Sequence, residues 1–430
     1  MVNKSIRRNL NRRKQAKPVK AETNTSPIYT LPREIVQQIF CKIEVANVLD
    51  YRLLCRYANQ CLGDAYFSQT LIRSNLKNSD FSRQAATLWV RWPKCFQVSY
   101  VQLVLSTTSK LEFKRPWSML KGRIPGALAL LTDLETLDLW GNVLVGPLPQ
   151  ELSTLKKLKL LSVPNNTLSG SVPLWLFEMP SLQTARLSVN YISGLPTDIP
   201  WNDTLKELEI NYTKLGATIP STIRKLKKLE TLGMRCSELV GKIPSTLGSL
   251  TYLKNLDLGS NKLFGGIPVE LGKLKNLENL DLSENGLTGE IPCELKGLEK
   301  LRVLNLSKNS LVGMVPTALG ALVSLEEVDL SNNSFEGGLP GSFVNMERLN
   351  SMDVSGNILD GDFPGWLFGM TTLREVSFKG NLGITGYIDD RILGMENLRD
   401  MDLKHTGVTI EKLREDAVAE LLARGVTITV

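Results

Sequence analysis

Leucine returns at a fixed spacing over most of the chain. From Leu134 to Leu403 the step is 24 residues, apart from one shorter unit after Leu182 and one longer unit after Leu373. The two leucines of a Leu-x-Leu triplet point to one side of a short strand, because side chains alternate along a strand. One unit cannot bury its leucines alone, so successive units are expected to stack around a shared apolar interior. The leucines that mark the repeat are Leu134, Leu158, Leu182, Leu205, Leu229, Leu253, Leu277, Leu301, Leu325, Leu349, Leu373 and Leu398.

The polar half of each unit predicts how the chain leaves the strand. An Asn follows the leucines, and its amide can satisfy backbone groups of the turn and of the next coil. Stacked copies therefore predict a ladder of asparagines. Gly supplies conformational freedom and Pro fixes φ, which favours a bend on the outer side over a long helix. The clearest unit carries Leu277, Leu280, Leu282, Asn285, Leu287, Gly289, Ile291 and Pro292.

This pattern resembles the plant-type leucine-rich repeat. The resemblance implies an α/β repeat fold, a right-handed solenoid of about 12 repeats of 24 residues with a parallel sheet on its concave face. It also implies a second short strand and a short helical turn on the outer side. The resemblance covers roughly two thirds of the chain and specifies the fold, whereas the function remains open because this architecture serves many binding roles.

The segment 28–75 predicts a small helical domain ahead of the repeats. Pro32 suits the first turn of a helix, and apolar residues follow it at helical spacing. The segment resembles an F-box, with Leu-Pro-x-Glu-Ile at its start and Phe67 and Leu71 near its end. A plain helical cap that shields the first repeat is the alternative. The F-box resemblance implies a contact with the adaptor subunit of an SCF-type ubiquitin ligase through Leu31, Pro32, Ile35, Ile39, Phe40, Leu53 and Cys55.

Two further stretches are expected to close the ends of the solenoid. Residues 98–104 alternate like a strand, and a degenerate repeat follows them. After the repeats, Thr409 can cap a helix over 410–424 with Leu422 on its buried face, and a last strand follows. The predicted domains are a disordered basic tail (1–27), an F-box-like domain (28–75), a linker with an N-terminal cap (76–133), the solenoid (134–406) and a helix-strand cap (407–430).

The formal net charge of +7 is concentrated at the N-terminus. Eight Lys or Arg and no acid lie within the first 21 residues, which leaves 43 basic against 44 acidic side chains in the rest. This tail has too few apolar side chains to pack and is expected to be disordered. We interpret it as a solvated extension. A nuclear-import signal is the main alternative, and a mitochondrial presequence or a nucleic-acid contact is a further one. Because the remainder is nearly neutral, nucleic acid is not expected as a partner.

Cysteine usage and the N-terminal sequence favour an intracellular protein. The six cysteines form no Cys-x-x-Cys and no pattern that flanks the repeats, whereas secreted plant-type repeat proteins usually carry a disulfide-bearing cap. The first residues are polar and basic, without the apolar core of a signal peptide. No run approaches the length needed to span a bilayer. We therefore expect a cytoplasmic or nuclear location, no membrane contact, and a chain complete without a span or a kinase domain.

The residues that enzymes use are sparse or follow the repeat. His405 is the only histidine, so neither a histidine-based triad nor a multi-ligand metal site can be assembled around it. The glycines recur with the repeat and do not form a phosphate-binding loop. Asp257, Asp281, Asp329 and Asp353 also recur with the repeat, and we interpret them as a solvated row on the concave face. We expect a binding protein with no cofactor, no metal and no catalytic residue.

The exposed positions two, four, six, seven and nine residues after each register leucine predict where a partner binds. In the units from Leu253 to Leu349 these positions are mostly small and polar, so we interpret these units as scaffold. Earlier units carry large aromatic and arginine side chains, which dominate binding hot spots, and Thr213 and Ser237 replace the ladder asparagine. Simple sequence drift is the alternative. The predicted partner-binding residues on the concave face are Trp140, Arg186, Tyr191, Glu209, Tyr212, Arg235 and Glu238.

The two resemblances together favour a substrate-recognition subunit of an SCF-type ubiquitin ligase. Such a subunit brings its target close to the ligase and forms no bond itself. Its expected partners are the adaptor, through the F-box-like segment, and an unknown protein target on the concave face. The first alternative is an intracellular leucine-rich scaffold or sensor without a ligase. The second is a secreted or cell-surface receptor ectodomain.

Overall fold

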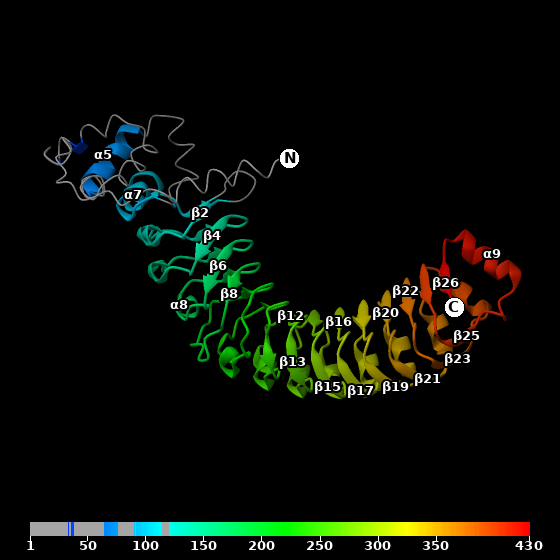
Figure 1. Cartoon of the computed structure of the whole chain (residues 1–430). Helices are drawn as coiled ribbons and strands as arrows, with labels where there is room; N and C mark the ends of the chain where they lie inside the picture. The colour runs from blue at the N-terminus through cyan, green and yellow to red at the C-terminus, as the bar shows by residue number, and fades with distance from the viewer. Residues whose placement is uncertain (1–32, 34–35, 38–63, 76–89, 91, 114–119) are drawn as a thin grey trace, which may run out of the picture. The chain divides into compact units, whose positions relative to one another are not determined.

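The computed structural model describes residues 33, 36–37, 64–75, 90, 92–113 and 120–430. The chain divides into two compact units. The first comprises residues 1–85 and 92–103, and the second comprises residues 86–91 and 104–430. Figure 1 shows both units.

The described part of the first unit is helical. It contains α5 (Ala65–Asn75) and α7 (Lys94–Tyr100), which continues as a π-helical turn over Val101–Leu105. The predicted strand over 98–104 is therefore wrong. Buried side chains at Phe96, Ser99 and Tyr100 follow helical spacing, and the Phe96 ring packs edge-on at 6.1 Å from the ring of Phe67 on α5. This packing against α5 decides between two periodicities that the sequence fits equally well.

A long parallel sheet runs through the second unit and confirms the predicted solenoid. Figure 1 shows its strands on the inner side of the curve. Neighbouring strands are in register one coil apart, and the middle residue of each three-residue strand from β1 to β24 is buried. The strands, in spatial order, are β1 (Lys110–Glu112), β3 (Thr136–Asp138), β5 (Leu160–Ser162), β7 (Thr184–Arg186), β9 (Glu207–Glu209), β10 (Thr231–Gly233), β12 (Asn255–Asp257), β14 (Asn279–Asp281), β16 (Val303–Asn305), β18 (Glu327–Asp329), β20 (Ser351–Asp353), β22 (Glu375–Ser377), β24 (Asp400–Asp402) and β26 (Thr427–Thr429).

Shorter sheets follow on the outer side, as the resemblance to plant-type repeats implies. One has four strands and the other eight. Between them, the described coil that starts at Leu205 has no strand other than β9. The four strands are β2 (Lys121–Gly122), β4 (Val143–Gly146), β6 (Thr167–Gly170) and β8 (Tyr191–Ile192). The eight are β11 (Val240–Gly241), β13 (Lys262–Gly265), β15 (Gly286–Gly289), β17 (Ser310–Met314), β19 (Ser334–Gly337), β21 (Ile358–Asp362), β23 (Gly383–Tyr387) and β25 (Gly407–Thr409).

Short helical turns complete the coils, and most begin directly after the proline of the repeat. Successive turns lie so close together that a Cβ at Gly248 would overlap the backbone carbonyl of Glu270 in the next turn. Glycine is therefore required there for space rather than for its backbone angles. The turns are η5 (Gly126–Leu130), η6 (Gln150–Thr154), α8 (Trp175–Glu178), η7 (Ser221–Lys225), η8 (Ser245–Ser249), η9 (Val269–Lys273), η10 (Cys293–Gly297), η11 (Thr317–Ala321), η12 (Gly341–Asn345), η13 (Gly365–Gly369) and η14 (Asp390–Gly394).

The predicted asparagine ladder is present. The amide nitrogen of Asn309 donates to the carbonyl oxygens of Leu282 at 3.0 Å and Leu306 at 3.1 Å, and its oxygen accepts from the backbone N–H of Leu287 at 3.1 Å. Each such side chain satisfies backbone groups of two coils that would otherwise be buried without partners. The same arrangement is made by Asn142, Asn166, Asn190, Asn261, Asn285, Asn333, Asn357 and Asn381.

The ladder is interrupted where the sequence replaces the asparagine. The Thr213 hydroxyl donates to the carbonyl of Ile210 at 3.0 Å, and the Ser237 hydroxyl donates to the same carbonyl at 2.6 Å. A hydroxyl has one donor, whereas an amide has two. Thr213 lies in the coil that lacks a second strand, and Ser237 lies in the coil after it, so the ladder is weakest at this part of the solenoid.

The C-terminal cap has the predicted order of helix and strand but a later helix start. α9 spans Glu415–Ala423, and Thr409 does not cap it, because Thr409 ends β25 and pairs with β23. Arg414 occupies the N-cap position instead. Leu422 is 69% exposed, so its predicted burial is wrong. β26 pairs with β24 and closes this end of the first sheet.

Candidate functional site

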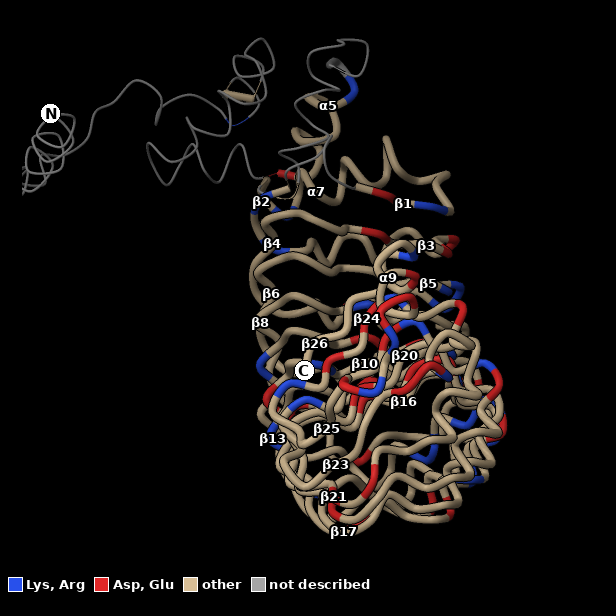
Figure 2. The backbone as a smooth tube through the Cα atoms, turned by 90° about the vertical axis from the view of Figure 1, so that its right-hand side faces the viewer, with Lys and Arg blue, Asp and Glu red and all other residues tan. Residues whose placement is uncertain are grey.

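The concave strand positions form an acidic strip. In β3 to β24, the first and third residues of each strand face away from the buried middle residue. Eleven of these positions are Asp or Glu and one is Arg, and Figure 2 colours the positions of acidic residues red along the backbone. The field along this face therefore favours a cationic partner. The eleven acids are Asp138, Glu207, Glu209, Asp257, Asp281, Glu327, Asp329, Asp353, Glu375, Asp400 and Asp402.

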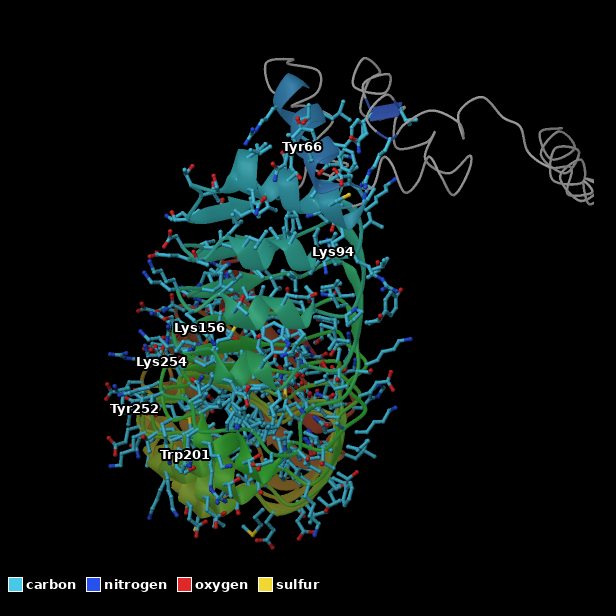
Figure 3. All side chains as sticks on the ribbon, turned by 90° about the vertical axis from the view of Figure 1, so that its left-hand side faces the viewer. Tyr66, Lys94, Lys156, Trp201, Tyr252 and Lys254 are labelled. Atoms are coloured by element: carbon cyan, nitrogen blue, oxygen red, sulfur yellow. The ribbon has the colours of Figure 1, made fainter. Side chains whose placement is uncertain are left out.

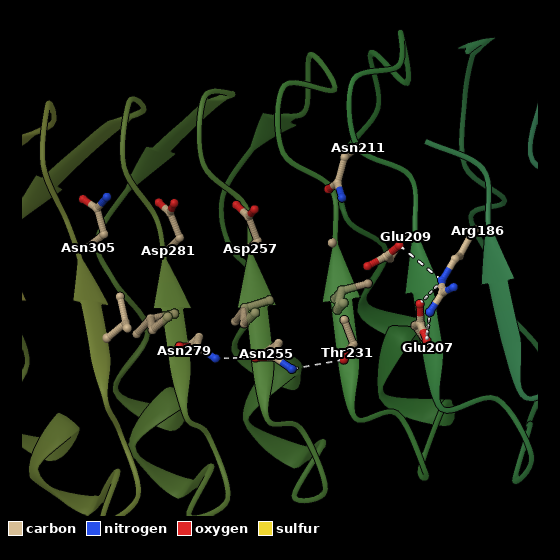
Figure 4. Close-up of a pocket in the computed structure, with 15 residues that line it drawn as sticks. Arg186, Glu207, Glu209, Asn211, Thr231, Asn255, Asp257, Asn279, Asp281 and Asn305 are labelled. Atoms are coloured by element: carbon tan, nitrogen blue, oxygen red, sulfur yellow. Dashed lines mark hydrogen bonds and ion pairs between the residues drawn. The ribbon is translucent and has the colours of Figure 1, made fainter. Parts of the chain in front are cut away.

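A pocket of about 570 Å³ opens on this face over β7 to β16 (Figure 4). Near its centre lies Gly233, the last residue of β10. Glu209 on β9 and Asp257 on β12 are the register partners of Gly233 on either side. Because Gly233 has no side chain, the two carboxylates flank an empty position in the acidic strip. We call this position the Gly233 notch, formed by Gly233, Glu209 and Asp257.

Two arginines approach the notch, and each gives its hydrogen bonds to another carboxylate. Arg186 holds both oxygens of Glu207, with Nε at 2.5 Å and Nη2 at 3.1 Å, while its Nε lies 3.6 Å from Glu209. Arg235 hydrogen-bonds Asp281, and its Nη1 lies 3.7 Å from Asp257. From the two arginines, Glu209 and Asp257 therefore receive only the longer ion contacts.

The pKa values of the two notch carboxylates reflect this arrangement. Burial raises the pKa of Glu209, and the charge of Glu207 raises it further against the opposing effect of Arg186. Burial likewise raises the pKa of Asp257, although the backbone N–H of Gly259 and the charge of Arg235 oppose the shift. The surroundings thus disfavour the ionised forms of both groups. A cation placed between them would relieve that penalty.

A second pocket of about 410 Å³ adjoins the first toward the N-terminal end of the sheet. The two pockets share Arg186 and Glu209. Trp140, which is 41% exposed, lines the second pocket together with Pro164. Asp138 and Ser162 complete its lining. An apolar wall thus stands beside the acidic strip, a combination suited to an extended polypeptide with mixed side chains.

Family comparisons agree with the geometry of the repeats. A model of the leucine-rich repeat region matches residues 203–314, and two further leucine-rich repeat models match residues 299–359 and 133–155. The chain is a leucine-rich repeat protein. Domains of this kind are typically binding modules without catalysis. The matched residues all lie in the solenoid, and the comparisons give no support for an F-box in 28–75.

Solved leucine-rich repeat structures resemble the solenoid. The ectodomain of the Arabidopsis receptor kinase HAESA, in complex with an IDA peptide hormone, is 30% identical over 74% of this chain and 56% of that chain, with a TM-score of 0.63. The Arabidopsis GASSHO1/SCHENGEN3 ectodomain, in complex with CASPARIAN STRIP INTEGRITY FACTOR 2, is 28% identical over 72% and 44%, with a TM-score of 0.52. A Leptospira interrogans leucine-rich repeat protein is 26% identical over 76% and 91%, with a TM-score of 0.59. The chain thus spans about half the length of these plant ectodomains. A search of curated proteins found no match.

The structure of this leucine-rich repeat protein brings some predicted partner-binding residues together and separates others. Trp140, Arg186 and Glu209 line the two pockets, and Arg235 contacts two pocket acids. The others lie past the ends of the first-sheet strands, outside both pockets. Of these, Tyr191 belongs to β8 beneath Lys214, Glu238 pairs with Lys262 at 3.2 Å, and Tyr212 is exposed in the turn after β9.

Sequence reasoning missed the contribution of Asp257, Asp281 and Gly233. The two aspartates match the ordinary repeat, which predicts only a solvated row of acids. In the structure, both are ion partners of Arg235, and both line the pocket. The available signal was Arg235, one coil before Asp257 and two coils before Asp281, with Gly259 at the matching position of the intervening coil.

The predicted adaptor-binding residues Leu31, Pro32, Ile35, Ile39, Phe40, Leu53 and Cys55 lie outside the described residues. Nearby, Arg33 forms an ion pair with Asp64 at 2.5 Å, just before α5, and Phe67 and Leu71 on α5 are buried. Within the described ranges, no group of three or more His, Cys, Asp or Glu could hold a metal ion. None of the helices that the structure describes is long and apolar enough to cross a membrane.

Proposed function

We propose that the concave face over β3 to β16 binds an extended polypeptide segment of a protein partner. The observation that carries this proposal is the pair of adjoining pockets that share Arg186 and Glu209. Together they offer an apolar wall at Trp140 and Pro164 and a charged floor along the strands. A segment lying across the strands can contact both at once. The HAESA ectodomain, of similar fold, is bound to a peptide hormone.

The end of the strands supplies further contact area. Trp140 and Tyr212 are 41% and 54% exposed, and both follow the ends of first-sheet strands. We call these two residues the aromatic rim. Exposed aromatic side chains contribute large contact areas at low entropic cost. The ladder interruption and the missing second strand fall in the same part of the solenoid, which supports a local specialisation for binding.

Peptides selected from a random phage-displayed library on the full-length chain provide a test. Binding of a labelled selected peptide is followed by fluorescence anisotropy. We expect Trp140→Ala/Tyr212→Ala to weaken binding at least about tenfold, as loss of hot-spot aromatics does. The matched control is Trp201→Ala/Tyr252→Ala. These aromatics, labelled in Figure 3, are 65% and 49% exposed, and they precede β9 and β12 in the chain. Equal weakening by both pairs, or selection of no peptide, contradicts the proposal.

A second proposal concerns the helical unit before the repeats. We propose that residues 28–75 dock to the adaptor of an SCF-type ubiquitin ligase, so that the solenoid recruits the target in the cytoplasm or nucleus. Support comes from the Leu-Pro-x-Glu-Ile sequence and from the packing of Phe67 and Leu71 on α5. Co-purification of the adaptor with the wild type but not with Leu31→Ala/Pro32→Ala is expected. Failure to recover the adaptor with either chain contradicts this role and favours a scaffold.

A further inference from the structure

We propose that the Gly233 notch binds one arginine side chain of the bound polypeptide, with the guanidinium held between Glu209 and Asp257. This inference rests on the proposed function of the concave face and adds the chemistry of one subsite. It commits to a cationic residue of a protein partner as the occupant.

The shape of the notch follows from two residues. A Cβ at Gly233 would lie 2.9 Å from the side-chain oxygen of Asn211, so a larger residue would crowd that amide. The Asn211 oxygen is held in place because it accepts the backbone N–H of Arg235 at 2.8 Å. The position therefore stays open, with Glu209 and Asp257 at the matching register positions of the two adjacent strands (Figure 4).

The charge balance points to a cation. The pocket lining contains four carboxylates and Arg186. Even when Arg235 is counted with them, two negative charges remain uncompensated. Since the two arginines hydrogen-bond Glu207 and Asp281, the excess charge resides on Glu209 and Asp257. Charge complementarity of this kind selects partners and suppresses those that bring a like charge.

The polar floor of the pocket does not compete for the ligand. Asn279 donates to Asn255 at 2.5 Å, and Asn255 donates to Thr231 at 3.2 Å, so these side chains partner one another (Figure 4). Asp257 also accepts the backbone N–H of Gly259 at 3.0 Å, which fixes its orientation. The carboxylates are thus pre-oriented, and less ordering is required when a ligand binds.

Strand spacing favours a guanidinium over a bare ion. Glu209 and Asp257 lie on strands separated by β10, which places their backbones about 10 Å apart. A metal ion needs several oxygens within about 2.5 Å, whereas a planar guanidinium carries donors on opposite edges and can bridge two carboxylates. An ammonium group has a single centre and spans a shorter distance between two carboxylates than a guanidinium does. We therefore assign arginine to the site in preference to lysine.

The test uses a peptide selected on the wild-type chain as above and synthesised with arginine, lysine or citrulline at its cationic position. Citrulline retains the shape of arginine and removes its charge. We expect the selected peptides to be enriched in arginine at one position. Replacing that arginine by citrulline should lower the affinity at least about tenfold, and replacing it by lysine should lower the affinity by a smaller factor. The variant Glu209→Gln/Asp257→Asn is expected to bind the arginine peptide at least about tenfold more weakly than the wild type does. In this variant, the arginine and citrulline peptides should bind with equal affinity.

Asp329→Asn/Asp353→Asn is the matched control. It removes two charges at the same strand position on β18 and β20, where each aspartate accepts the backbone N–H two residues on, as Asp257 does. The control is expected to weaken binding about twofold or less, because distant exposed charges are screened. Equal weakening by the control, or no loss with citrulline, overturns the arginine site while leaving the peptide-binding face standing. If no peptide is selected, the proposed function fails and the arginine site with it.

Discussion

Arg235 forms an ion pair with Asp281 two coils further along the solenoid by passing over Gly259. A Cβ at Gly259 would lie 2.5 Å from Nη1 of Arg235 and 2.9 Å from a carboxylate oxygen of Asp281. Because Gly259 has no side chain, the Arg235 side chain has room to extend past β12 to Asp281. This link ties three coils together at the edge of the pocket and draws Arg235 away from Asp257.

We predict that Gly259→Ala breaks this ion pair at small cost. The colliding atoms are the ends of flexible side chains, and the pair is partly exposed, so the free energy of unfolding should fall by less than about 1 kcal/mol. Urea denaturation of the wild type and the variant measures the difference. A loss larger than about 2 kcal/mol would mean that the pair, rather than the repeat core, holds these coils together.

A glycine in the outer turns should respond very differently. At Gly272, a Cβ would overlap the backbone carbonyl of Glu294, which cannot move without displacing the next coil. Gly272→Ala should therefore lower the free energy of unfolding by about 2 kcal/mol or more. Gly369→Ala is the control, since a Cβ there meets no atom within 4 Å. The control should be neutral or slightly stabilising. If both substitutions changed the free energy of unfolding equally, adjacent turns would be able to move apart and accommodate a Cβ at Gly272.

The ladder asparagines should be costly to remove. Asn309→Ala leaves the carbonyl of Leu282 and the N–H of Leu287 without their partners, at about 1–3 kcal/mol for each buried group. A loss of at least about 2 kcal/mol is expected in urea denaturation. Asn345→Ala, at an exposed position in η12, should change stability by less than about 0.5 kcal/mol. A ladder variant as stable as this control would refute the role assigned to the amide.

Binding of an arginine peptide should weaken as the pH falls. Burial raises the pKa of both Glu209 and Asp257, so they become protonated at a higher pH than ordinary carboxylates, whose pKa is about 4. Their negative charge, and with it the attraction for the guanidinium, is lost as pH decreases through these raised values. Anisotropy titrations between about pH 7 and pH 4.5 measure the effect, and the citrulline peptide should show little dependence.

The pH dependence of folding stability is expected to be opposite to the pH dependence of peptide binding. Because the folded pKa of each group lies above its unfolded value, their stabilising contribution is present at low pH and is lost as pH rises through the folded pKa. Ionised Glu209 and Asp257 therefore destabilise the fold at neutral pH. Glu209→Gln/Asp257→Asn should not lower the melting temperature there. A clear decrease would show that the two carboxylates stabilise the solenoid.

The repeat chemistry made the sheet, the ladder and the outer bends predictable, because each depends on residues within one unit and its neighbour. The strand predicted over 98–104 failed because helix and strand periodicities both fit, and packing against α5 decides between them. In the site, Trp140 and Arg186 stood out as departures from the repeat. Asp257 and Asp281 did not, because their role arises only when Arg235 reaches them across the folded sheet.

Hydroxyl-radical footprinting of the full-length chain with and without a selected peptide tests the central claim most directly. The aromatic rim of Trp140 and Tyr212 and the control aromatics Trp201 and Tyr252 are all exposed, so we expect all four to react in the free chain. A peptide on the concave face should protect the rim and leave Trp201 and Tyr252 unchanged. Protection of Trp201 and Tyr252 with an unprotected rim would place the binding surface elsewhere and contradict the account.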